Sequence, residues 1–111
     1  MKENNLETTF ELNGNIIGKW ISDSSNPTNI TVVFNSNKTV SFIYIGFGNK
    51  GQDITENGTW SKVNNKINIT WNYTDVGFEN WTAQIQELSA TKLVWKESID
   101  GKTYTFVFFR Q

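Results

Sequence analysis

Hydrophobic and polar residues alternate with a period of two along much of this chain. The pattern is clearest in residues 66–73 and recurs in residues 80–87 and 103–110. Because successive side chains of a β-strand point to opposite faces, we predict strands with one buried and one solvated face. In the first of these runs, the apolar positions are Ile67, Ile69, Trp71 and Tyr73.

Eight such runs follow one another from residue 16 onward, with the spacing expected of an all-β sandwich or barrel. No segment in this region has an apolar pattern of helical period long enough to compete. Residues 1–14 are polar and are interpreted as an N-terminal leader or linker, so the predicted domain covers residues 15–111. The predicted strands are residues 16–23, 29–35, 39–46, 55–62, 66–73, 80–87, 92–98 and 103–110.

Turn residues between the runs favour hairpins between neighbours in the sequence. Asp100–Gly101 is typical of a two-residue type I′ turn, and Asn64–Asn65 is compatible with the same turn. Asn57–Gly58 falls inside a predicted strand and is interpreted as a β-bulge. Because the connections are short, we expect an up-and-down meander that closes into a single eight-stranded antiparallel barrel without exposed edges.

Gly18-Lys19-Trp20 resembles the G-x-W signature on the first strand of the calycin superfamily, which includes lipocalins, fatty-acid-binding proteins and avidins. A second such motif, Gly58-Thr59-Trp60, and an aromatic last strand ending in Arg110 extend the resemblance over residues 16–110. These pieces are similar to small bacterial lipocalin-like domains, many of them lipoproteins, and the resemblance implies a barrel that binds a ligand. The chain departs from the lipocalin pattern in three ways. It has no cysteine, and it lacks room for the long C-terminal helix of a typical lipocalin. It also has Asn37–Lys38 in place of a turn glycine, which requires Asn37 to be left-handed.

Trp20 and Arg110 are expected to meet at one end of the barrel. The first and last strands are neighbours in a closed meander, and Arg110 has the same parity as Phe106 and Phe108. A guanidinium group can lie flat on an indole ring, which an ammonium group cannot. Arg110 is therefore interpreted either as a structural plug against Trp20, which the calycin resemblance favours, or as a ligand-binding residue.

The opposite end of the barrel is the predicted mouth, where Tyr and Trp offer apolar rings with a polar group. No Lys is expected to face inward at this depth, so a neutral or only peripherally charged ligand is predicted. Small barrels are either filled by side chains or hold one small ligand, and both interpretations are open. The predicted ligand-binding residues are Tyr44, Trp71, Tyr73, Trp81 and Tyr104, with Phe47 and Phe78 on covering loops and Phe34, Phe42, Trp95 and Phe106 deeper.

The composition removes most catalytic chemistry. The 111 residues include neither Cys nor His, which excludes thiol and imidazole groups and the usual zinc or haem ligands. No catalytic, metal or cofactor site is predicted. The carboxylates Asp23, Asp53, Glu56 and Glu79 form no pair with a spacing that indicates glycosidase chemistry. The net charge is −1 with scattered lysines, which argues against a nucleic-acid partner. We expect a protein that is not an enzyme.

The predicted function is the binding of a small apolar or amphipathic molecule. One alternative is a non-catalytic envelope scaffold or interaction domain with a filled barrel. Another is an avidin-like biotin binder, because Gly18–Trp20 and Asn68–Trp71 are similar to avidin strands, but the polar set for the ureido ring is not recognisable. No apolar run is long enough to span a bilayer. The N-terminus has no signal-peptide pattern, so we expect a cytoplasmic protein, or a lipid-anchored envelope or secreted protein if a targeting segment precedes this sequence.

Overall fold

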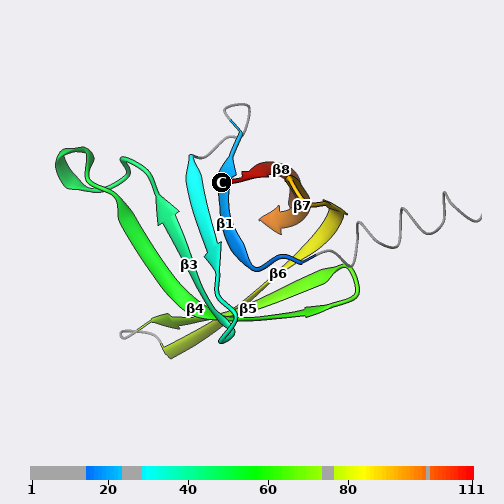
Figure 1. Ribbon diagram of the computed structural model, residues 1–111. Coiled ribbons are helices and arrows are strands. Elements are labelled where there is room, and N and C mark those ends of the chain that lie inside the picture. Colours follow the sequence, from blue (N-terminus) through cyan, green and yellow to red (C-terminus); the bar gives the residue numbers. More distant parts are fainter. Residues whose placement is uncertain (1–14, 24–28, 74–76, 100) are drawn as a thin grey trace, which may run out of the picture.

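The alternating runs form a closed barrel in the computed structural model, which describes residues 15–23, 29–73, 77–99 and 101–111. Within the strands, the side chains of residues 72, 73, 77–79 and 99 lie outside this description. Each strand pairs antiparallel with the next in sequence, and the last strand pairs with the first. Figure 1 shows β8 returning beside β1. The prediction of an eight-stranded up-and-down barrel is confirmed.

The strands agree closely with the predicted runs, and a single 3-10 turn, η1 (Asn49–Gly51), lies in the connection from β3 to β4. In the described part of the chain no helix is long and apolar enough to cross a membrane. The strands are β1 (Gly18–Ser22), β2 (Ile30–Phe34), β3 (Thr39–Tyr44), β4 (Ile54–Val63), β5 (Lys66–Tyr73), β6 (Gly77–Leu88), β7 (Lys92–Ile99) and β8 (Lys102–Arg110).

Aromatic rings fill the middle of the barrel. The ring of Phe42 lies edge-to-face with Trp71 and Trp81, at centroid distances of 4.9 Å and 5.6 Å, and stacks on Trp95 at 6.1 Å. Such pairs contribute about 0.5–1.5 kcal/mol each beyond the burial of their surface. Further rings extend this cluster toward β8, where Trp95 contacts Phe108 at 4.6 Å. The core at this level is therefore built from large, rigid side chains.

The turn after β2 differs from the prediction. Lys38, not Asn37, adopts the left-handed conformation, with φ of 75°. Asn37 instead accepts hydrogen bonds on Oδ1 from the backbone N–H and the hydroxyl of Thr39, at 3.1 Å and 2.6 Å. The Lys38 ammonium lies 4.3 Å from the centroid of the Trp60 ring. The side-chain bonds of Asn37 and this cation–π contact offset the cost of a left-handed lysine.

Gly58 does not form the predicted bulge. It lies in regular pairing between Val40 of β3 and Trp71 of β5. A Cβ atom on this residue would overlap the carbonyl oxygen of Thr70 and press on the Trp71 ring. The glycine is required by the close approach of two strands, not by an irregular backbone.

The bulge lies instead in the pairing of β6 with β7, between Ile85 and Glu87. One extra residue in a strand shifts the side chains beyond it to the other face. This shift explains why Ile85 and Leu88, which have opposite parity, are both fully buried. The hairpin of β5 and β6 is also longer than predicted, since Gly77 pairs with Tyr73. The prediction that Phe78 lies in a loop is wrong, because Phe78 is part of β6.

Candidate functional site

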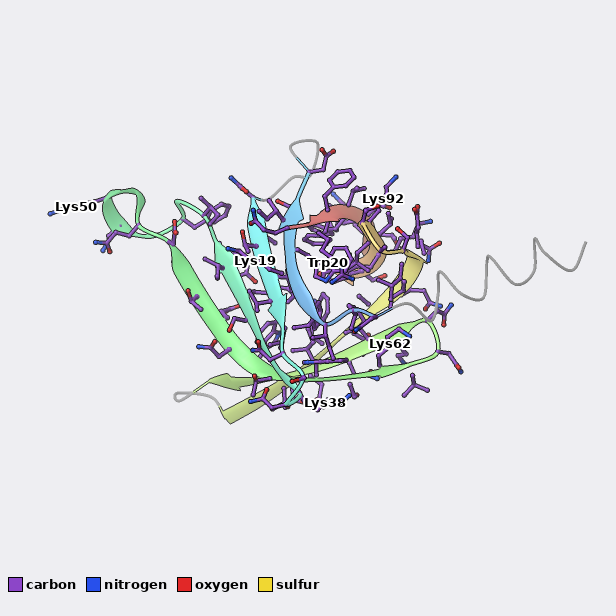
Figure 2. All side chains as sticks on the ribbon, viewed as in Figure 1. Lys19, Trp20, Lys38, Lys50, Lys62 and Lys92 are labelled. Carbon is purple, nitrogen blue, oxygen red and sulfur yellow. The ribbon has the colours of Figure 1, made fainter. Side chains whose placement is uncertain are left out.

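One end of the barrel, which we name the Arg110 end, is closed around Trp20 and Arg110. The two residues are opposite each other in the pairing of β1 with β8, and the guanidinium carbon lies 4.2 Å from the centroid of the Trp20 ring. Trp20 is fully buried on the inner side of β1 (Figure 2), and its indole N–H donates to the Ile16 carbonyl oxygen at 2.8 Å. The expected contact between the two side chains is present.

Arg110 also ties three segments of backbone together. Its Nε, Nη1 and Nη2 atoms donate to the carbonyl oxygens of Ala90, Ile17 and Asn15, at 2.7 Å, 2.8 Å and 2.5 Å. Gly18 leaves room for this arrangement, since a Cβ there would lie 2.7 Å from Nη1 of Arg110. Because three of its five N–H donors bind backbone oxygens, we interpret Arg110 as a structural residue.

The opposite end, which we name the Glu97 end, gathers aromatic and acidic side chains. Tyr44, Trp81 and Tyr104 are half-buried and pack against the core. Glu97 of β7 lies opposite Tyr104 of β8 in the strand register. Glu56 lies opposite the buried Phe42, and paired residues of an antiparallel ladder share a face. Two carboxylates therefore belong to the inner face at this end.

Both oxygens of Glu97 are held by indole groups. Oε2 accepts the Nε1–H of Trp81 at 3.0 Å, and Oε1 accepts that of Trp95 at 3.2 Å. Burial raises the pKa of the Glu97 carboxyl, although the two indole hydrogen bonds act in the opposite direction. The ion pair present among the described residues joins Lys92 to Glu87 and does not include Glu97. The carboxylate is thus oriented by neutral donors.

Replacing Glu97 with Gln should make the protein's stability depend differently on pH. Since the pKa is raised, the folded state binds this proton more tightly than the unfolded state does. The stability that Glu97 contributes is complete below its ordinary pKa of about 4.3 and is lost as the pH rises through the raised value. Glu97→Gln does not titrate, so urea unfolding at a series of pH values should show it gaining stability relative to wild type as the pH rises above about 4. A difference that does not change with pH would contradict this.

Tyr44 connects Glu56, on the inner face of the barrel, to an exposed loop. Its hydroxyl donates to Oε1 of Glu56 at 3.0 Å, and its ring lies 6.1 Å from that of Phe47. Phe47 is 56% exposed and lies in the connection between β3 and β4. The loop is held by the backbone N–H of Gly46, which donates to the Asp53 carboxylate at 2.9 Å. The Phe47 ring is therefore placed beside the Glu97 end, as the sequence predicted.

The structure brings most of the predicted ligand-binding residues together, but at different depths. Trp81 and Tyr104 are half-buried, whereas Trp71 is buried under Phe42 and belongs to the core. The side chains of Tyr73 and Phe78 lie outside the described residues. The positions predicted to lie deeper, Phe34, Phe42, Trp95 and Phe106, are all buried.

Sequence reasoning missed Glu97 and the inward position of Glu56. Glu97 has the same parity as Leu93 and Trp95, which are fully buried, so the alternation in β7 contained the signal. Among the described residues, no group of three or more metal-ligating side chains is present. The sequence-based expectation concerned lysine only, and it did not foresee that this inner face carries the carboxylates of Glu56 and Glu97.

No protein-family model matches the chain, and neither does any curated protein. Solved structures do match. A lipocalin-like protein from Bacteroides uniformis is 22% identical, with a TM-score of 0.59 over 88% of this chain and 99% of that chain. An uncharacterized protein from Bacteroides eggerthii is 16% identical, with a TM-score of 0.54 over 87% of this chain and all of that chain. At these identities the likeness concerns the fold alone: the chain has a lipocalin-like barrel fold.

Proposed function

We propose that this protein is a non-enzymatic binding protein that holds a small amphipathic molecule at the Glu97 end of its barrel. The observation that carries the proposal is the difference between the two ends. Arg110 ties backbone segments together at one end. At the other end, half-buried Trp81 and Tyr104 stand beside an oriented carboxylate. Apolar area that a ligand covers there contributes about 25 cal/mol per Å².

The core limits how deep such a ligand lies. Phe42, Trp71 and Trp95 pack against one another across the middle of the barrel. A ligand of the proposed kind rests on top of this aromatic layer and contacts the rings that are still half-exposed. The same packing favours the second candidate function, a scaffold or interaction domain whose barrel is filled by its own side chains.

Titration with an environment-sensitive apolar dye and small hydrophobic compounds tests the proposal. The expected result is a saturable signal that Trp81→Ala weakens about thirty-fold, because truncating a central aromatic contact costs about 2 kcal/mol. Phe109→Ala is the matched control, since Phe109 is an exposed aromatic residue of β8 near the Arg110 end. Circular dichroism of each variant shows whether the barrel is intact.

Two results would contradict ligand binding at this end. If no compound gives a saturable signal, the filled scaffold remains as the function. If Phe109→Ala weakens the signal as much as Trp81→Ala does, the dye binds to exposed aromatic surface and not to a site.

A further inference from the structure

We infer that the ligand carries a protonated amine or quaternary ammonium group beside its apolar body, and that Glu97 binds this group. The inference rests on the proposed function, because it names the chemical class of the molecule that the Glu97 end would hold. It replaces the neutral ligand predicted from the sequence.

The carboxylate of Glu97 is held in a fixed position. Glu97 is fixed by the indole groups of Trp81 and Trp95, one on each oxygen. An ionised carboxylate accepts about four hydrogen bonds, so each oxygen keeps acceptor capacity for a ligand. The side chain is half-buried at the end of the barrel and is positioned before any ligand arrives. Such preorganisation lowers the cost of binding.

Glu97 has no cationic partner among the described residues. Removing a carboxylate from water is costly unless a cation accompanies it. Within the described part of the chain, Glu97 bonds to neutral indole donors and forms no ion pair with Lys or Arg. The raised pKa of Glu97 is the sign of this cost. A cationic group on the ligand supplies the partner that the protein does not.

Aromatic rings surround the Glu97 carboxylate. Tyr104 lies opposite Glu97 in the register, and the Trp81 ring lies 5.5 Å from that of Trp95. Aromatic faces attract cations, and ammonium ligands that carry alkyl groups are recognised by proteins in this way. Tyr44 and Glu56 add a further ring and a second carboxylate on the same inner face. An apolar body with a cationic group matches this combination better than a fatty acid does.

Among the residues that the structure describes, no lysine or arginine forms an ion pair with Glu97. Lys38 and Lys62 belong to the Arg110 end, where Lys38 lies over the Trp60 ring. Lys102 lies at the start of β8, two residues from Tyr104, and its side chain is exposed. Lys102 is therefore the basic residue to use as a control for a general charge effect.

Three compounds with the same chain and different head groups test the inference by isothermal titration calorimetry: n-octylamine, 1-octanol and octanoate. Wild type should bind octylamine at least about ten-fold more tightly than octanol, with octanoate the weakest. Glu97→Gln should remove the advantage of the amine over octanol. Lys102→Gln should change the preference by less than about three-fold. If Glu97→Gln does not fold, Glu97→Asp, which withdraws the carboxylate, should reduce the advantage.

The outcomes separate the inference from the proposed function. Equal binding of octylamine and octanol by wild type would overturn the inference and leave ligand binding at this end standing. An advantage of the amine that persists fully in the Glu97 variants would also overturn it. Failure of all three compounds to bind would count against the inference and the proposed function together.

Discussion

Trp20→Ala is expected to lower the free energy of unfolding by about 3–5 kcal/mol, the usual cost of truncating a large buried aromatic side chain. Trp20 is fully buried, so its removal leaves a cavity between β1 and the rest of the core. The change also removes the hydrogen bond to Ile16 and the surface on which Arg110 lies. Unfolding in urea, followed by circular dichroism, measures the loss.

Phe109→Ala is the matched control for Trp20→Ala. Phe109 is an aromatic residue beside Arg110, but 45% of its surface is exposed, so its truncation should cost clearly less. Arg110→Lys should also destabilise the barrel, because an ammonium group loses the planar contact with the ring and the fixed fork of donors. A loss below about 1 kcal/mol for Trp20→Ala, against the usual cost of such changes, would show that the Arg110 end is not the stabilising closure described here.

Gly58→Ala should destabilise the barrel clearly, because a methyl group has no room between β4 and β5. The new Cβ would overlap the Thr70 carbonyl oxygen, which is backbone and cannot turn aside. Overpacking of this kind costs about 1–3 kcal/mol and occasionally more, and we expect the upper end of that range. The pairing of β4 with β5 should loosen locally, which amide hydrogen exchange of Thr59 and Thr70 would report.

Gly101→Ala separates steric overlap from backbone strain. Gly101 has φ of 80°, and a Cβ atom there would meet nothing within 4 Å. Its replacement should cost about 1–2 kcal/mol through the left-handed backbone alone. If Gly58→Ala costs less than Gly101→Ala, the close approach of β4 and β5 is not the reason for the glycine.

Much of the fold could be predicted from the alternation of residues, because each strand has one face toward the core. The run from Ile67 to Trp71 is buried at every second position, as expected. Two local features could not be predicted in this way. From the sequence, Gly58 was interpreted as a β-bulge, because a glycine within a strand marks either a bulge or a close approach of two backbones. The actual bulge, between Ile85 and Glu87, is marked by no glycine.

The candidate site was predicted less completely than the fold. The rings of Trp81 and Tyr104 were identified because aromatic residues of the inward parity are easily recognised. Glu97 was missed because a carboxylate at an inward position contradicts the general rule that charges remain in water. What overrides the rule is a pair of indole donors from Trp81 and Trp95. Which donors converge on one carboxylate depends on the strand register, not on residue spacing alone.

The indole N–H signals in a ¹H–¹⁵N spectrum test most directly where a ligand binds. The chain has five Trp residues, and single Trp→Phe variants assign their signals. On titration with octylamine, the signals of Trp81 and Trp95 should shift together and saturate, because both groups donate to Glu97. Those of Trp20 and Trp60, which donate to the Ile16 and Asn35 carbonyl oxygens, should remain in place. Saturable shifts confined to Trp20 and Trp60, or no saturable shift at Trp81 and Trp95, would contradict a ligand site at the Glu97 end.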